Sequence, residues 1–232
     1  LSPIVSSPAA ANLPKYTEYI LKKMAGSTLY TVFIVSGRPI KQLKSKIGLK
    51  GIGFAGNHGL QLQSKKLNYL NPCAKRMRPA INAIKKELNE RLKGIKGVII
   101  EDKGLSLSIH YRMANKKGSE QVKRKAIKAV DGYLKKDLIK ITKGKKVIEI
   151  RPPVEWDKGR LCLYILKKLK LSARALPIYL GDDKTDEDAF ASLKNKGITV
   201  FVGKKGASTK ALFRLNDTKE VAKFLHELYL IR

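Results

Sequence analysis

In Leu176-Pro-Ile-Tyr-Leu-Gly-Asp-Asp-Lys-Thr-Asp-Glu-Asp-Ala-Phe190, a short apolar run leads directly into a cluster of acids. The run at 176–181 is typical of a buried strand, and residues 185–194 are typical of a helix. An earlier stretch has the same order: Tyr30–Val35 is apolar and rich in β-formers, Ser36-Gly37-Arg38-Pro39 follows it, and a helix is expected next. Repeated strand–loop–helix units build a parallel sheet, so we expect an α/β domain.

The middle of the chain has a different pattern. Met77, Ile81, Ile84, Leu88 and Leu92 recur every three or four residues, which predicts an amphipathic helix. The predicted elements, in order, are a helix at 75–93, strands at 97–102 and 105–112 joined at Lys103-Gly104, a helix at 119–135, and strands at 137–142 and 146–151 joined at Lys143-Gly144. This α-β-β-α-β-β module at 65–151 divides the α/β domain into residues 1–64 and 152–232.

The charge of the chain is strongly positive. It has 49 Lys and Arg against 19 Asp and Glu, a net charge of +30, and residues 61–150 hold the largest share, 24 basic and 8 acidic. Such an excess attracts polyanions. Alternatively, the lysines only keep the protein surface hydrated and have no specific partner. No basic motif interleaved with aromatics appears, so we expect no specific nucleic-acid partner and only weak, salt-sensitive binding.

Several classes of protein are not indicated. No apolar run approaches the roughly 18–20 residues of a membrane helix, and no signal peptide is visible. Cys73 and Cys162 are the two cysteines, and neither lies in a Cys-x-x-Cys pattern, which disfavours a disulfide framework and a zinc site. We expect a cytoplasmic protein with no membrane partner.

Acids are concentrated where the strand at 176–181 ends. Five of the 19 acids lie between Asp182 and Asp188. A hard cation such as Mg²⁺ would explain them, and so would a helix N-terminus, whose dipole favours acids. Ser36-Gly37-Arg38 follows the other strand and offers a hydroxyl and backbone amides to an anionic oxygen. Because ligands bind at the carboxyl ends of parallel strands, the two clusters together predict a metal-assisted phosphate site.

The strands of the middle module present a second polar surface. Apolar and polar residues alternate along Leu105–Arg112 and 147–151, so one face should pack on the helices. The other face can present Glu101, Lys103, Arg112 and Glu149. This face is either the ordinary solvent side of an antiparallel sheet or a lid that holds a polyhydroxylated ligand.

The chain resembles the trehalose-6-phosphate phosphatase family of the haloacid-dehalogenase (HAD) superfamily. The stretches that carry the resemblance are Ile34-Val-Ser-Gly-Arg38, Ala55-Gly-Asn-His-Gly59, Glu101-Asp-Lys-Gly-Leu-Ser-Leu-Ser-Ile-His-Tyr-Arg112, Glu149-Ile-Arg-Pro152, Lys158-Gly159 and Gly181-Asp-Asp-Lys-Thr-Asp-Glu-Asp-Ala-Phe190. They occur in the family's order over nearly the whole chain. The resemblance implies a HAD-like Rossmannoid core with a parallel sheet, interrupted by a small α+β cap.

The resemblance also implies an activity and a set of residues. The activity is Mg²⁺-dependent hydrolysis of trehalose 6-phosphate to trehalose and phosphate through an aspartyl-phosphate. Ser36 would bind a phosphoryl oxygen, and Lys158 would neutralise charge on the phosphoryl group and the nucleophile. Asp182 would bind Mg²⁺, and Asp183 and Asp186 would either bind it directly or hold its ligands. The sugar and phosphate would be bound by Arg38, Asn57, His58, Glu101, Lys103, Arg112 and Glu149.

One part of the family's pattern is missing. The nucleophile of the family lies in an Asp-x-Asp-Gly-Thr motif, which the sequence does not contain. Leu1-Ser-Pro-Ile-Val5 resembles the residues that follow that motif, so we expect the motif and its strand to precede Leu1. The alternatives are a HAD phosphatase for another sugar phosphate and a non-catalytic regulatory domain beside a trehalose-phosphate synthase, which is also a candidate partner.

Overall fold

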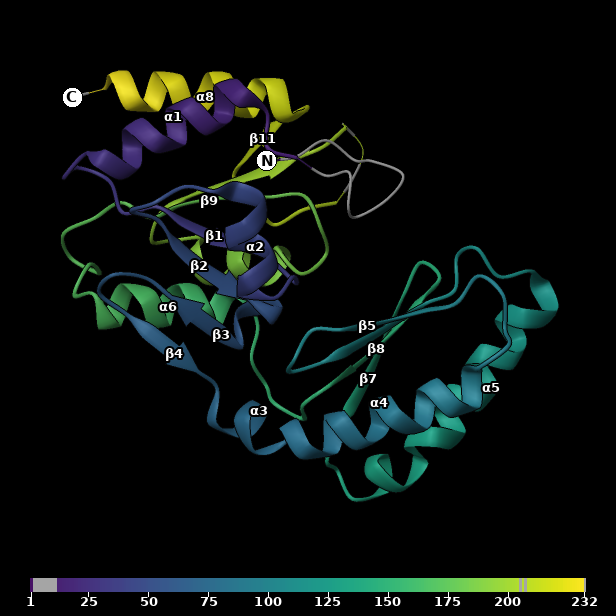
Figure 1. The fold of residues 1–232 in the computed structure, drawn as a ribbon. Coiled ribbons are helices and arrows are strands. Elements are labelled where there is room, and N and C mark those ends of the chain that lie inside the picture. Colours follow the sequence, from purple (N-terminus) through teal and green to yellow (C-terminus); the bar gives the residue numbers. More distant parts are fainter. Residues whose placement is uncertain (2–11, 205, 207, 232) are drawn as a thin grey trace. The chain divides into compact units, whose positions relative to one another are not determined.

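The chain folds into two compact units in the computed structural model, which describes residues 1, 12–204, 206 and 208–231 (Figure 1). Leu1–Tyr69 and Trp156–Arg232 form one unit, here called the core unit, and Leu70–Glu155 form the other, here called the insert. The chain stays in the core unit up to Tyr69 because strand β4 (Asn68–Leu70) belongs to the same sheet as β3 (Gln61–Gln63). Within the described residues, no helix is long and apolar enough to cross a membrane.

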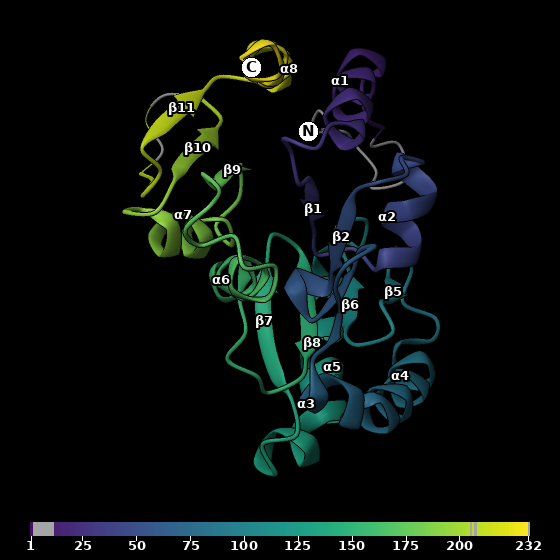
Figure 2. The same cartoon turned by 90° about the vertical axis from the view of Figure 1, so that its left-hand side faces the viewer.

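The strands of the core unit show the expected parallel pairing. Strand β1 (Phe33–Val35) runs parallel to β2 (Gly53–Gly56), and β10 (Ile198–Val202) runs parallel to both β9 (Ile178–Gly181) and β11 (Phe213–Leu215). They form two sheets, with the orders β1-β2-β3-β4 and β11-β10-β9 (Figure 2). The sequence does not predict β11, because three residues are too few to show alternation.

Alternating side chains of these strands pack on helices on both faces. Ile34, Phe54 and Leu180 point into a core formed with α1, α2 and α8. Their neighbours Val35 and Tyr179 point to the opposite face, against α6 and α7. The period of two in a strand therefore yields three layers, helix–sheet–helix. The helices are α1 (Lys15–Gly26), α2 (Ile40–Ile47), α6 (Lys158–Lys168), α7 (Glu187–Leu193) and α8 (Thr218–Leu230).

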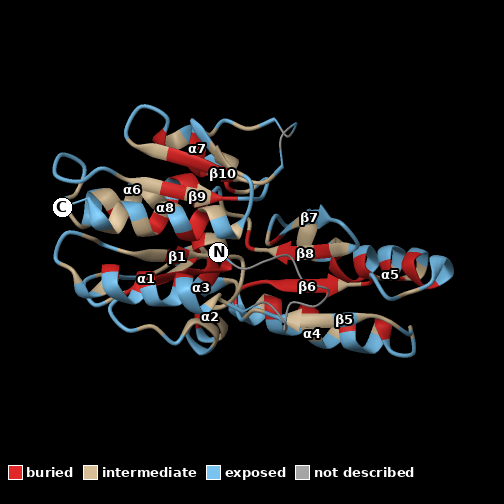
Figure 3. Ribbon diagram, turned by 90° about the horizontal axis from the view of Figure 1, so that it is seen from above, coloured by how far each residue is buried: buried red, intermediate tan, exposed pale blue. Residues whose placement is uncertain are grey.

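The insert has the predicted α-β-β-α-β-β order. Its elements are α3 (Pro72–Arg76), α4 (Arg78–Leu92), β5 (Ile99–Asp102), β6 (Leu107–His110), α5 (Lys116–Lys135), β7 (Lys140–Gly144) and β8 (Val147–Arg151). The strands form one antiparallel sheet in the order β5-β6-β8-β7. Buried side chains of β6 and β8 pack against those of α4 and α5, so both helices cover one face (Figure 3).

Two local predictions for the insert were wrong. Gly144 pairs with Val147, so the second hairpin turns at 145–146 and not at Lys143-Gly144; Lys146 adopts the left-handed conformation there, with φ 62°. The single helix predicted at 75–93 is two helices, α3 and α4. The break lies at Met77, because Pro79 is tolerated in the first turn of a new helix and not in the interior of a continuing one.

Candidate active site

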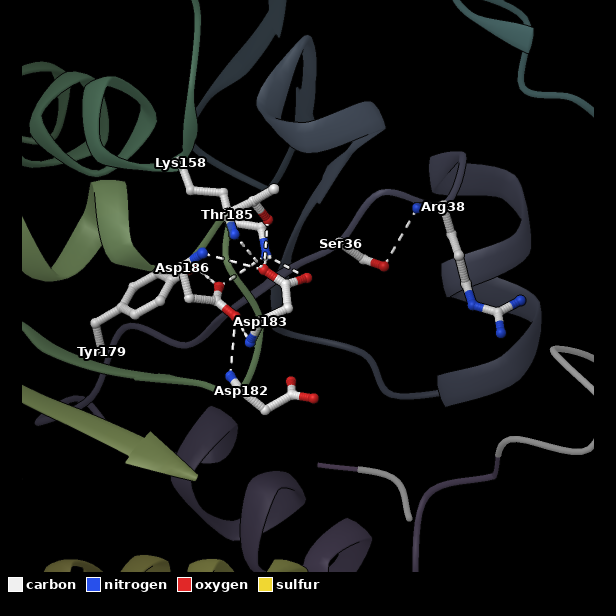
Figure 4. A network of polar contacts seen from close by, with 8 residues as sticks. All are labelled: Ser36, Arg38, Lys158, Tyr179, Asp182, Asp183, Thr185 and Asp186. Atoms are coloured by element: carbon white, nitrogen blue, oxygen red, sulfur yellow. Dashed lines mark hydrogen bonds and ion pairs between the residues drawn. The ribbon is translucent and has the colours of Figure 1, made fainter. Parts of the chain in front are cut away.

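Two strand ends and two helix starts bring polar side chains together in the core unit. Ser36 directly follows β1, and Asp182 directly follows β9, so both lie at carboxyl ends of parallel strands. Lys158 is the first residue of α6, and Asp186 immediately precedes α7. Figure 4 shows the side chains of Lys158, Asp183 and Asp186 pointing toward one another, with the Asp182 carboxylate beside them. Ligands of α/β proteins bind at this edge of the sheet.

The buried carboxylate of Asp186 is the centre of the network. Its Oδ1 accepts hydrogen bonds from Lys158 Nζ and from the Tyr179 hydroxyl, both at 2.7 Å. Its Oδ2 accepts from the backbone N–H groups of Asp182 at 2.9 Å and Asp183 at 3.0 Å. Burial and the adjacent Asp186 charge raise the pKa of Tyr179, so its hydroxyl stays a donor. Asp186 thus holds the Lys158 ammonium and the loop after β9 in place.

Asp183 shapes that loop with one oxygen. Its Oδ1 accepts from Thr185 N at 2.7 Å, Thr185 Oγ1 at 2.6 Å and Asp186 N at 3.1 Å. Lys158 Nζ lies 3.3 Å from the same oxygen. Burial raises the pKa of Asp183, but the Lys158 charge and the Thr185 hydrogen bonds outweigh burial, so the pKa lies below its usual value. Asp183 is therefore an anion that balances Lys158.

Asp182 is the carboxylate that the network leaves accessible. Within the described part of the chain, the hydrogen bond at Asp182 uses its backbone N–H, and none ends on its exposed carboxylate. Desolvation raises the pKa of this carboxyl, and the charges of Asp186 and Asp183 raise it further. The folded protein therefore disfavours negative charge at Asp182 unless a cation compensates it.

The donor set at this edge fits Mg²⁺. Magnesium usually takes one or two carboxylates and fills its other positions with water and substrate phosphate. The described residues contain no cluster of three or more acidic, His or Cys ligands that would form a closed cage. Asp182 has an accessible carboxylate, and Asp183 Oδ2 has a long contact with Lys158 Nζ, at 3.5 Å. Each carboxylate oxygen of Asp186 already accepts two hydrogen bonds. Asp186 is therefore better suited to hold its neighbours in position than to bind the metal ion.

The loop after β1 is held by the loop after β2. His58 N donates to Ser36 O at 3.0 Å, and Asn57 N donates to Arg38 O at 2.9 Å. Asn57 and His58 both adopt left-handed backbone conformations, with φ of 51° and 55°. The His58 ring packs directly on Gly37, where a Cβ would lie 2.5 Å from His58 Nε2 and would force the ring to move. The structure thus brings Ser36, Arg38, Asn57 and His58 together, with Ser36 Oγ accepting from Arg38 N at 3.2 Å.

The remaining predicted residues lie in the insert, and Glu101, Lys103 and Glu149 lie on the sheet face opposite the helices. Lys103 Nζ forms an ion pair with Glu149 Oε1 at 2.9 Å, and Glu101 Oε2 lies 2.9 Å from His110 Nε2. Arg112 is exposed in the turn that follows β6 and is not part of these contacts. The sugar-binding roles of Glu101, Lys103, Arg112 and Glu149 stay predictions.

Sequence reasoning missed three members of these networks. Tyr179 lies in an apolar strand, and Thr185 is the first residue of the helix expected at 185–194. Ser108, whose Oγ donates to Glu149 Oε1 at 3.1 Å, is one of several alternating serines. Alternation places Tyr179 on the face of β9 that meets α7, which was the available signal. Residues 2–11 are outside the described residues, including 2–5, which were expected to follow the nucleophile motif.

Gly181→Ala is expected to damage this site through packing alone. A Cβ at Gly181 would clash with the Asp186 side chain, so the carboxylate must move, and we expect its hydrogen bond with Lys158 to weaken. We expect a loss of about 1–3 kcal/mol in the free energy of unfolding. Urea denaturation measures it. The control is Gly132→Ala, because a Cβ there meets nothing within 4 Å in helix α5, and this variant should be no less stable than the wild type. Equal stability of both variants would contradict the described position of Asp186.

Comparison with known proteins points to one family. The sequence profile of the trehalose-phosphatase family matches residues 1–219. A probable trehalose-phosphate phosphatase D of Arabidopsis thaliana is 34% identical over 98% of this chain and 64% of its own length. A trehalose-phosphate phosphatase of Mycobacterium tuberculosis is 35% identical over 98% of this chain and 58% of its own length. The chain thus spans about three fifths of these relatives.

Solved structures show the same fold. The C-terminal domain of a trehalose-6-phosphate phosphatase of C. albicans superposes with a TM-score of 0.75 at 26% identity, covering 100% of this chain and 89% of that one. A trehalose-6-phosphate phosphatase related protein superposes with a TM-score of 0.84 at 20% identity, covering 100% and 93%. The HAD-like fold expected from the sequence is confirmed, and the chain belongs to the trehalose-phosphatase family.

Proposed function

We propose that this chain carries the phosphate-binding and sugar-binding residues of a Mg²⁺-dependent phosphatase that acts on trehalose 6-phosphate. The observation that carries the proposal is the saturated Asp186 carboxylate. It binds both a buried cation, Lys158, and the backbone N–H of Asp182, whose carboxylate stays accessible. An ammonium suits a phosphoryl oxygen, and an open carboxylate suits a hard metal ion. Family membership supports the choice of substrate.

Lys158 and Ser36 bind the phosphoryl group in this proposal. The Lys158 side chain is 5% exposed and lies between Asp186 and Asp183, so it is aimed before substrate arrives. A preorganised charge stabilises developing negative charge without reorganising at the moment of reaction. The Ser36 hydroxyl adds a donor from the carboxyl end of β1. Asn57 and His58 support that strand end through the backbone contacts at Ser36 and Arg38.

Asp182 and Asp183 would hold the metal ion. When bound, Mg²⁺ supplies positive charge that stabilises the phosphoryl oxygens. Asp186 positions both of these residues, because its Oδ2 accepts hydrogen bonds from their backbone N–H groups. The nucleophile implied by the family resemblance belongs to a motif that residues 1–232 do not contain, so the proposal assigns that role to none of them.

The insert would bind the sugar. Lys103, Glu149 and Ser108 are linked by hydrogen bonds on one sheet face, so their donors and acceptors are oriented together. Charged hydrogen-bonding groups in fixed positions recognise hydroxyl groups well. The proposal assigns sugar specificity to this face and phosphate chemistry to the strand ends of the core unit.

A substrate panel tests the function. The chain as its gene encodes it is incubated with Mg²⁺ and trehalose 6-phosphate, glucose 6-phosphate or another phosphorylated disaccharide, and phosphate release is measured. We expect the highest kcat/KM with trehalose 6-phosphate. A higher value for another sugar phosphate would replace the substrate, and no release from any of them would support a regulatory role.

Glu149→Gln is expected to weaken recognition of the sugar and spare the chemistry. The variant breaks the ion pair with Lys103 on the sugar-binding face, so KM for trehalose 6-phosphate should rise about tenfold. Hydrolysis of p-nitrophenyl phosphate should change less than about twofold, since that ester makes no sugar contacts. The control is Asp102→Asn, which breaks the Lys85–Asp102 pair on the helix side of the same sheet. Equal losses on both substrates would remove Glu149 from sugar binding.

A further inference from the structure

The phosphate-binding residues of the proposed function lie on two different elements of the core unit. Ser36 follows β1, which belongs to the sheet β1-β2-β3-β4, whereas Lys158 begins helix α6. Within the described residues, the four hydrogen bonds of the Asp186 carboxylate fix Lys158 and the loop after β9, and none of them reaches the loop after β1. Other contacts therefore have to fix the Ser36 hydroxyl relative to the Lys158 ammonium.

The side chain of Trp156 connects these two elements. Trp156 precedes Lys158 by two residues, and its Nε1–H donates to Gly59 O at 2.8 Å. Gly59 is the last residue of the turn Asn57–Gly59, whose central backbone N–H donates to Ser36 O at 3.0 Å. One indole hydrogen bond thus links the start of α6 with the turn that supports the Ser36 loop.

This hydrogen bond lies in a packed junction. Gly59 is buried and has a φ of 91°, and a Cβ there would lie 3.1 Å from both Trp156 Nε1 and Leu161 Cβ. Ala55 of β2 and Leu161 of α6 are buried in one hydrophobic cluster, on which Trp156 also packs. Segments that are packed this closely leave little space for the turn to shift. Removal of the indole donor would take a hydrogen bond from a buried carbonyl group, which is unfavourable.

Two tyrosine rings set the orientation of the indole. Tyr69 of β4 stacks on Trp156 with the ring centroids 5.2 Å apart, and Tyr164 of α6 meets the indole edge-on at 5.9 Å. Both arrangements are favourable for aromatic pairs. Tyr69 and Trp156 are also the core-unit residues on either side of the insert in the sequence. The indole is therefore held by β4 and α6 with its N–H directed at Gly59 O.

We propose that Trp156 is a positioning residue of the phosphate site, which keeps the Ser36 loop in register with Lys158. The inference rests on the proposed function, because that proposal gives Ser36 and Lys158 the same phosphoryl group to bind. Both can contact it only when the two elements are correctly spaced, and a misplacement of about 1 Å can cost on the order of 10²-fold in rate. Trp156 itself contacts neither phosphate nor sugar in this proposal.

Trp156→Phe tests this role by kinetics on the chain as its gene encodes it. Phenylalanine keeps an aromatic ring beside Tyr69 and removes the N–H donor. We expect KM to rise about fivefold to tenfold, the effect of one hydrogen bond. The factor should be the same for trehalose 6-phosphate and p-nitrophenyl phosphate, because both esters use the same phosphate site. A residue that only stabilises the fold would lower the fraction of active molecules, and thus kcat, with KM unchanged.

The matched control is Tyr164→Phe. It keeps the ring that packs against Trp156 and removes only a hydroxyl group. This variant should leave KM for both esters within about twofold of the wild-type value, because the indole and its donor stay in place.

Proton exchange at the indole tests the same coupling in the unaltered protein. Trp156 is the only tryptophan of the chain, so its Nε1–H gives a single indole resonance in NMR. If the hydrogen bond to Gly59 favours phosphate binding, phosphate must favour the hydrogen bond by the same factor, because such coupling is reciprocal. Saturating inorganic phosphate with Mg²⁺ should therefore slow exchange of this proton with solvent about fivefold to tenfold.

The outcomes separate this inference from the proposed function. An unchanged KM in Trp156→Phe overturns the positioning role. So does an unchanged exchange rate at a phosphate concentration at which calorimetry shows saturation, and this result decides alone where Trp156→Phe does not fold. A wild-type chain that binds no phosphate and hydrolyses neither ester overturns the proposed function, and the positioning role with it.

Discussion

Asp182→Asn is expected to lower phosphate release from trehalose 6-phosphate by at least about 10²-fold without lowering the thermal midpoint of the protein. The Asp182 carboxylate accepts no hydrogen bond within the described residues, so the fold loses no hydrogen bond. Its pKa is raised by desolvation and by Asp186 and Asp183. A raised carboxyl pKa means that ionisation at neutral pH destabilises the folded state, and the neutral Asn relieves this repulsion.

The matched control is Asp188→Asn. Asp188 belongs to the same acidic cluster, and its pKa is also raised, by burial and by Asp157, but it lies in the first turn of α7 and outside the Lys158 network. Steady-state kinetics at several Mg²⁺ concentrations, with differential scanning calorimetry, measure both effects. Activity of Asp182→Asn close to that of the wild type at low Mg²⁺ would remove Asp182 from the site.

Lys158→Met should destabilise the protein and abolish turnover together. Methionine keeps the length of the apolar stem but removes the ammonium that lies 2.7 Å from Asp186 Oδ1 and 3.3 Å from Asp183 Oδ1. Breaking a buried ion pair by removing one partner leaves an uncompensated charge, at a cost of about 3–5 kcal/mol. Loss of the phosphoryl-binding cation should reduce kcat by at least about 10²-fold.

A second variant separates stability from catalysis at Lys158. In the double variant Lys158→Met/Asp186→Asn, the buried negative charge is also removed, so part of the lost stability should return while kcat stays low. Urea denaturation and phosphate release measure the two quantities on the same preparations. Recovery of activity in the double variant would show that Lys158 acts on the fold and not on the phosphoryl group.

The fold could be predicted from the sequence more accurately than the separate roles of the residues in the site. Alternation along β6 and β8 was sufficient to place Ile109 and Ile148 against the helices, since a strand has two faces and only one was apolar. The hairpin turn was misplaced by two residues, because Gly144 indicates a turn locally while its true role is to leave space beside Val147.

The acidic cluster shows where sequence reasoning ends. Asp182, Asp183 and Asp186 are the same residue type within five positions, and their spacing alone makes each of them a candidate metal ligand. Only the three-dimensional contacts distinguish them. Asp186 is saturated by four donors, among them a hydroxyl from the apolar strand β9 that no motif contains. Asp182 is left accessible.

Phosphate release from trehalose 6-phosphate, measured after chelation and again after Mg²⁺ is restored, tests the central claim most directly. The chain as its gene encodes it should release phosphate with Mg²⁺, stop when EDTA removes the metal, and recover when Mg²⁺ is added back, whereas Asp182→Asn should remain inactive throughout. Release that continues unchanged in EDTA, or recovery of Asp182→Asn to the wild-type rate, would contradict the account.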